Sequence, residues 1–299
     1  MKGRLPRLLG VLALLASVAY LATVAVHRAS SFPEVVWSPR AIGAFAAATG
    51  IYLLMLLAGS AAWFLLLRSA GAETSLVTVL AVCGLGQAGK YLPGNVGQYL
   101  GRAALARQHG IPLHKSVLTL GFETTGLIVT AAACALLTGA GGSLAAPWKI
   151  ALLAAAAVAA PFLLVHVLER WFPGILKERL GVERLPRPSV AALGACLALY
   201  AAVFAGGGLS FDLLARGLFG AGSAVSWWQA VPAFALSWVL GFITPGAPAG
   251  LGVREALLVS GTAALYGPGA ALSTALAFRL VTVLGDGIAF LAGAAFRRA

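Results

Sequence analysis

Six long runs of apolar residues, separated by short polar stretches, set the pattern of this chain. A helix rises about 1.5 Å per residue, so about 20 apolar residues span the roughly 30 Å hydrocarbon core of a bilayer. The six runs cover residues 8–26, 41–67, 116–138, 150–168, 189–214 and 268–296. This pattern predicts an all-α polytopic membrane protein with about six transmembrane helices.

Four further apolar segments are shorter and come in two pairs. Residues 76–89 and 96–108 form the first pair, and residues 229–243 and 251–266 form the second. The first segment would reach roughly 21 Å as a helix, which is less than the thickness of the core. A Pro-Gly dipeptide divides each pair, at 93–94 and at 245–246, and proline does not continue a helix. Each pair is therefore predicted to be a re-entrant helical hairpin with a broken tip.

The two predicted hairpins share a motif. Arg102 follows Gly94 by eight residues, Arg254 follows Gly246 by eight, and the two motifs are 152 residues apart. Each hairpin precedes a full span, and the hairpins enter from opposite sides, which predicts the inverted repeat that many transporters contain. We expect one membrane domain over residues 1–299, with two N-terminal spans in 1–75, repeat 1 in 76–140, connecting spans in 141–226 and repeat 2 in 227–299.

Composition and charge support this layout. The chain is 60% hydrophobic and 10% charged, which excludes an ordinary soluble domain, and its net charge is +12. Basic residues concentrate in the segments predicted to be cytoplasmic, including the charged loop 169–188, as the positive-inside rule requires. We therefore attribute the charge to topology and not to nucleic-acid binding. Both termini are predicted to be cytoplasmic, with the protein in a bacterial cytoplasmic (inner) membrane.

The broken hairpin tips are candidate anion sites. A half-helix that begins inside a membrane starts with unpaired N–H groups and a partial positive charge. Arg102 and Arg254 are expected about two turns into their half-helices, and Lys90 directly precedes the first tip. Arginine donates two parallel hydrogen bonds to phosphate, so we predict that these cations contact an anionic head group. The predicted tip residues of the same site are Gly94, Asn95, Gly246, Gly250 and Gly252.

The charged residues also have structural interpretations, because buried charges are usually paired. Arg102 and Arg254 can brace neighbouring helices through Glu123, Glu255 or Asp286, and such pairing is compatible with head-group contact. Arg279, Glu123 and Glu255 also belong to the predicted substrate-binding site, and Arg279 is expected to pair with Glu123 or Glu255. A proton-coupling role for Glu123 is a further alternative.

Chemical catalysis is not expected. Hydrolytic or transfer chemistry needs a nucleophile, a base or a metal cluster, and neither tip contains a histidine. The three cysteines, Cys83, Cys134 and Cys196, lie in apolar runs without metal-binding spacing. We therefore predict no enzyme activity, no metal and no cofactor.

The two motifs resemble a known family. Residues 90–111 read KYLPGNVGQYLGRAALARQHGI, and residues 244–259 read TPGAPAGLGVREALLV. They are similar to the lysylphosphatidylglycerol synthase transmembrane, or flippase-like, family, in which Pro-Gly followed by Gly-Val-Arg-Glu is the usual ending. The resemblance covers residues 76–296 and implies a membrane protein that moves or accommodates phospholipids or lipid-linked head groups. Larger members add an aminoacyl-transferase domain, which this chain lacks, so synthase activity is not expected.

Together these observations predict a lipid transporter that binds an anionic head group at mid-membrane and moves it between leaflets. The alternatives are a small-anion or proton-coupled solute transporter, or a non-catalytic membrane partner of a lipid-modifying synthase or glycosyltransferase. Expected partners are anionic phospholipids or lipid-linked phosphates, with a second copy of the chain or such a synthase or glycosyltransferase as the protein partner.

Overall fold

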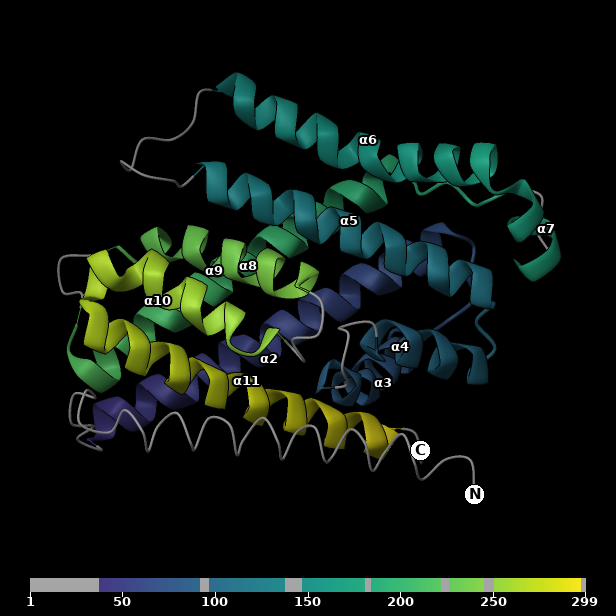
Figure 1. Ribbon diagram of the computed structural model, residues 1–299. Coiled ribbons are helices and arrows are strands. Elements are labelled where there is room, and N and C mark those ends of the chain that lie inside the picture. Colours follow the sequence, from purple (N-terminus) through teal and green to yellow (C-terminus); the bar gives the residue numbers. More distant parts are fainter. Residues whose placement is uncertain are drawn as a thin grey trace.

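The computed structural model describes residues 38–91, 97–137, 147–180, 184–221, 226–244 and 250–296. The first predicted span, 8–26, and the Pro-Gly tips at 92–96 and 245–249 therefore lie outside the described residues. All regular elements in the described ranges are helical (Figure 1).

Four long helices form the centre of the molecule: α2 (Pro39–Ser69), α5 (Leu113–Leu137), α8 (Val190–Phe219) and α11 (Pro268–Phe296). Each is long and apolar enough to cross a membrane. Helix α6 (Pro147–Trp171) packs against α5 on one side of the bundle (Figure 1). The predicted fold class, an all-α polytopic membrane protein, is confirmed.

The first short pair forms two helices that pack against each other. Helix α3 (Leu76–Gly86) begins after Ser75, whose hydroxyl accepts a hydrogen bond from the Thr78 N–H at 3.1 Å. It continues into a 3-10 helix, η2 (Gln87–Tyr91), just before the tip, and the chain returns as α4 (Gly97–Gln108). Since α3 and α4 are about 16 and 18 Å long, neither crosses the core alone.

The second short pair has the same organisation. A 3-10 turn, η3 (Trp227–Ala230), leads into α9 (Val231–Ile243), and the return helix is α10 (Val253–Tyr266). Helix α10 begins at Val253, directly after Gly252, where φ is +82°, a backbone conformation that favours glycine. This start is two residues later than predicted.

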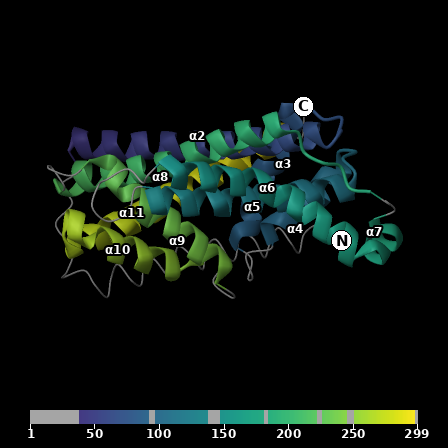
Figure 2. The same cartoon turned by 90° about the horizontal axis from the view of Figure 1, so that it is seen from above.

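The two hairpins enter the bundle from opposite ends and pack crosswise. Figures 1 and 2 show α3 and α4 at one end of the long helices and α9 and α10 at the other. Helix α3 packs on α11, the span that follows the second hairpin, while α9 packs on α5, the span that follows the first. This exchange of partners is the arrangement that an inverted repeat produces.

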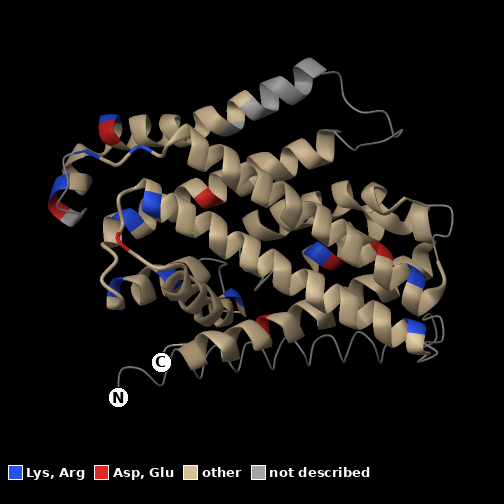
Figure 3. Cartoon of the chain, turned by 180° about the vertical axis from the view of Figure 1, so that it is seen from behind, with Lys and Arg blue, Asp and Glu red and all other residues tan. Residues whose placement is uncertain are grey.

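Basic residues gather at the end of the bundle where the first hairpin enters (Figure 3). Helix ends meet there: Lys115 Nζ donates to the Gly71 carbonyl at 2.7 Å, and the Ser189 N–H donates to Ser69 Oγ at 2.7 Å. The predicted loop 169–188 contains a short helix, α7 (Pro173–Leu180), at this end. Its Leu176 is buried, which explains why the segment is ordered into a helix against the bundle.

The contact between α3 and α11 depends on two glycines, Gly84 and Gly293. A Cβ added at Gly293 would lie 2.8 Å from the Ala81 carbonyl oxygen and 2.9 Å from the Leu85 nitrogen, both backbone atoms. We expect Gly293→Ala to lower stability by about 1–3 kcal/mol, because backbone atoms cannot move aside as side chains do. Thermal unfolding in detergent measures this, with Gly287→Ala on the same helix as the control, since nothing lies within 4 Å of its added Cβ. Equal melting temperatures for the two variants would contradict the close packing.

Candidate functional site

A cavity of about 180 Å³ lies between the two hairpins and the long helices. Tyr52 of α2, Glu123 of α5, Val203 of α8 and Thr282 of α11 line it, and each lies near the middle of its helix. The cavity therefore lies near the middle of the bundle. Its polar and charged lining residues include Tyr52, Ser60, Gln87, Lys90, Gln98, Tyr99, Arg102, Glu123, Arg254 and Thr282.

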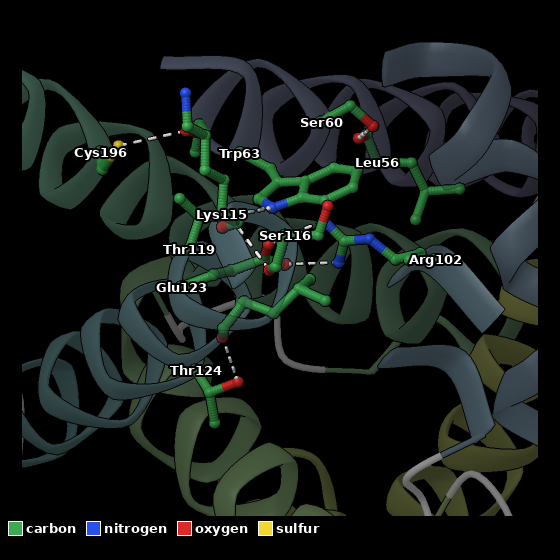
Figure 4. Close-up of polar contacts among 12 residues, drawn as sticks. Leu56, Ser60, Trp63, Arg102, Lys115, Ser116, Thr119, Glu123, Thr124 and Cys196 are labelled. Carbon is green, nitrogen blue, oxygen red and sulfur yellow. Dashed lines mark hydrogen bonds and ion pairs between the residues drawn. The ribbon is translucent and has the colours of Figure 1, made fainter. Parts of the chain in front are cut away.

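On the first-hairpin side, Arg102 of α4 forms a two-pronged ion pair with Glu123 of α5 (Figure 4). Its two terminal nitrogens donate to the two carboxylate oxygens at 2.8 and 2.7 Å. The guanidinium also lies over the Trp63 ring, with its central carbon 4.2 Å from the ring centroid. Gly86 of α3 leaves room for the Arg102 side chain, because an added Cβ would lie 2.7 Å from Arg102 Cγ. The charge of Arg102 is thus compensated inside the protein.

Lys90 is held by a second buried network. Its Nζ donates to Asp286 Oδ1 at 2.9 Å and to the Tyr52 hydroxyl at 3.0 Å. The Tyr52 hydroxyl donates to the same carboxylate oxygen at 2.7 Å, and the Tyr91 hydroxyl donates to Oδ2 at 2.9 Å. Asp286 therefore accepts three hydrogen bonds and ties the chain just before the first tip to α2 and α11. These hydrogen bonds hold the Lys90 ammonium group inside the bundle.

Arg254 differs from the other two cavity cations. It is the second residue of α10, so it lies in the first turn and not two turns along, because the helix begins only at Val253. Its aliphatic stem passes against Gly241 of α9 and against Gly250, where an added Cβ would lie 2.6 Å from Arg254 Cγ and Cδ. In the described ranges no hydrogen bond or ion pair joins Arg254 to another side chain. The N–H groups of the first turn add partial positive charge beside it.

Behind Arg254, a further pair connects the second hairpin to α11. Arg279 was expected to pair with Glu123 or Glu255. Its Nε lies 3.7 Å from Glu255 Oε1. Glu255 Oε2 accepts the Gly252 N–H at 2.7 Å, so that donor is already used within the chain. Arg254, Glu255 and Arg279 line a small space that adjoins the main cavity.

An aromatic wall completes the cavity on the α9 side. The Trp238 and Phe242 rings stack with an interplanar angle of 7° and centroids 5.5 Å apart. Tyr99 of α4 meets Phe242 edge-on at 5.8 Å, so the two hairpins touch through this pair. Together these rings give the cavity an apolar part of its wall.

Among the described residues, the deep cations around the site outnumber the deep carboxylates by one. The four deep cations are Lys90, Arg102, Arg254 and Arg279, and the three deep carboxylates are Glu123, Glu255 and Asp286. Each carboxylate lies next to a cation other than Arg254. The cavity can therefore attract an anion, and Arg254 is the side chain best placed to bind it.

Five of the predicted site residues line the main cavity: Lys90, Arg102, Glu123, Gly250 and Arg254. Glu255, Arg279 and Gly252 lie behind it or at the start of α10, while Gly94, Asn95 and Gly246 lie outside the described residues. Sequence reasoning treated Asp286 as structural and did not select Tyr52 or Tyr91. Two features of the sequence pointed to this network. The last predicted span contains a carboxylate, Asp286, and no acidic partner was assigned to Lys90.

The chain was compared with known families and proteins. The family model described as "Lysylphosphatidylglycerol synthase TM region" matches residues 8–289. A search of the curated proteins found no match.

Proposed function

We propose that this chain, which belongs to the lysylphosphatidylglycerol synthase TM-region family, binds an anionic lipid head group in its central cavity and moves the lipid between leaflets. Membership of this family indicates an integral membrane protein related to lipid handling. The finer proposal, head-group binding and transfer, rests on the geometry of the cavity.

One observation carries the proposal: a cavity at mid-depth contains an arginine, Arg254, that forms no ion pair with an acidic side chain in the described ranges. A charge at this depth is costly and needs a functional or structural reason. A phosphate accepting two parallel hydrogen bonds from Arg254 would supply the missing counter-charge. At about 180 Å³ the cavity is smaller than the roughly 300–1,000 Å³ of pockets that enclose whole drug-sized molecules, so the acyl chains would remain in the bilayer.

The crossed packing of the hairpins suggests how the lipid would move. Each hairpin is anchored to a long helix by a buried ion pair, Arg102 to Glu123 in the first and Arg279 to Glu255 in the second. Rocking of one repeat against the other would open the cavity to one leaflet and then to the other. The proposed cycle breaks no covalent bond, so we propose a transporter and not an enzyme.

We also propose an orientation. The end of the bundle with the gathered basic residues would face the cytoplasm, which places the entry of the first hairpin and the C-terminal end of α11 on that side. The membrane would be the bacterial cytoplasmic membrane.

Lipid movement in reconstituted liposomes tests the proposal. We expect the wild-type protein to accelerate transbilayer movement of an anionic phospholipid that carries a fluorophore on one acyl chain. Arg254→Ala should slow it roughly tenfold to a hundredfold, because a charge-assisted hydrogen-bond donor is lost. Arg107→Ala, at the exposed end of α4, removes the same charge away from the cavity and should move lipid at the wild-type rate.

A second measurement separates lipid from free anion as the cargo. Sealed vesicles loaded with inorganic phosphate should retain it in the presence of the wild-type protein. Rapid phosphate release without lipid movement would instead support the small-anion transporter.

A further inference from the structure

The corner between α6 and α7 exposes two large aromatic side chains. Trp171, the last residue of α6, is 74% exposed, and the adjacent Phe172 is 46% exposed. Helix α6 lies on the outside of the bundle, and α7 follows it at the end where the basic residues gather (Figures 1 and 3). Since removing large aromatic side chains from water is favourable, this exposed pair indicates a partner at the corner.

The exposed face of α6 leads directly to this corner. Leu163, Val167 and Trp171 are four residues apart, so they lie on one face of the helix, and all three are exposed. Such an apolar face on a membrane-spanning helix is suited to contact with acyl chains. Trp171 lies about 12 Å beyond Leu163, at the end of the helix, and tryptophan at the end of a span is typical of the head-group level. This continuity favours a lipid surface over a protein as the partner.

Exposed basic residues precede and follow the aromatic pair. Arg170 lies directly before it, and Lys177, Arg184 and Arg187 come after it. Glu178 is the one exposed acid in the described part of residues 170–187. The corner therefore combines aromatic side chains with an excess of positive charge, which is the composition that binds an anionic lipid surface.

Buried contacts hold the basic residues at the corner. Leu176 of α7 and Leu185 belong to one buried cluster, which also includes Val165 of α6. The Leu185 N–H donates to Glu169 Oε1 at 2.9 Å, which keeps the chain next to Arg184 at the end of α6. The corner is thus already formed in the structure, and none of its described residues lines the central cavity.

We infer that the α6–α7 corner is a second lipid site, which binds the anionic surface of the adjacent leaflet. Trp171 and Phe172 insert between the head groups, and Arg170, Arg184 and Arg187 contact the negatively charged groups of the lipids. A single basic residue close to an anionic bilayer attracts it enough to enrich anionic lipid roughly fivefold. The inference does not depend on the proposed transport function, because it concerns other residues and needs no movement of lipid between leaflets.

A fluorescent reporter on α7 tests the inference. Gly174 is exposed and nothing lies within 4 Å of its added Cβ, so Gly174→Cys can be labelled without disturbing the packing. Cys83 and Cys196 are buried, so only Cys134 is replaced, by alanine. The labelled protein is placed in nanodiscs with the same small fraction of either phosphatidylserine or phosphatidylcholine that carries a nitroxide quencher high on one acyl chain. We expect both lipids to quench, and phosphatidylserine to quench as a roughly fivefold higher concentration of phosphatidylcholine does.

Variants separate the aromatic contribution from the charged one. Replacing Arg170, Arg184 and Arg187 together by glutamine should abolish the preference for phosphatidylserine, while continued quenching by phosphatidylcholine shows that α7 remains at the bilayer. Trp171→Ser with Phe172→Ser should weaken quenching by both lipids. The matched controls are Arg40→Gln and Trp227→Ser, exposed residues at the opposite end of the bundle, and they should change neither value. High salt should reduce the preference without any substitution, because it screens exposed charges.

The outcomes also distinguish this site from the cavity. Quenching by neither lipid would show that the corner does not contact the bilayer, and equal quenching at low salt would show no anionic preference, so either result would overturn the inference. Arg254→Ala should keep the full preference. If it abolished the preference, the reporter would be responding to lipid in the cavity and the surface site would be refuted.

Discussion

Glu123→Ala is expected to lower the free energy of unfolding by about 3–5 kcal/mol, because it leaves the Arg102 guanidinium buried without its counter-charge. Arg102 and Glu123 side chains are only 10% and 7% exposed, so the guanidinium would lose its counter-charge in a largely buried position. The remaining contact with the Trp63 ring contributes only on the order of 1–2 kcal/mol and does not compensate for the loss. Chemical or thermal unfolding in detergent, followed by circular dichroism, measures the change.

A double variant distinguishes the effect of the two charges from the effect of the volume that the two side chains fill. Arg102→Met with Glu123→Leu replaces both charges by apolar groups, and we expect it to recover most of the stability lost in Glu123→Ala. If Glu123→Ala were as stable as the wild type, the ion pair would not anchor α4 to α5 as described here.

Arg254→Glu should weaken the binding of a monoanionic phospholipid by at least about 1,000-fold. The substitution changes the excess charge of the deep site from one positive to one negative. Two unit charges about 4 Å apart interact by about 4 kcal/mol at the effective dielectric constant typical near a protein surface, so loss of the attraction alone corresponds to about three orders of magnitude in affinity, and repulsion by the glutamate adds to it. Equilibrium binding of a labelled anionic lipid in micelles measures this directly.

A conservative variant provides the matched control. Arg254→Lys keeps the charge but loses the two-pronged donor geometry, so we expect a loss of only about tenfold. Comparable affinity of Arg254→Glu and wild type would mean that the phosphate binds elsewhere.

The fold could be predicted largely from hydrophobic length. The spans 41–67, 116–138, 150–168 and 189–214 correspond to α2, α5, α6 and α8, with ends that differ by a few residues. Segment length separated the short hairpin helices from full spans because the thickness of a bilayer is fixed. Opposite entry of the hairpins also followed from counting spans along the chain, and the ribbons show it (Figure 1).

The site could be predicted only in part, because sequence spacing does not determine which buried charges meet. Arg102 was expected to pair with an acid, but the choice among its three possible acids required coordinates. Arg254 lies in the first turn because of the positive φ angles at Gly250 and Gly252. The spacing of apolar residues along the sequence does not predict these backbone angles. The Lys90–Asp286 network joins residues 196 positions apart through two tyrosines, and nothing in a local pattern indicates such a contact.

The central claim is that the cavity holds a lipid phosphate at Arg254. A density map of the protein in nanodiscs of anionic phospholipid tests it most directly. We predict density for a phosphate within hydrogen-bonding distance of the Arg254 guanidinium, with acyl-chain density leaving the cavity towards the bilayer. A map of the same quality that shows only water in the cavity, with ordered lipid confined to the outer surface, would contradict it.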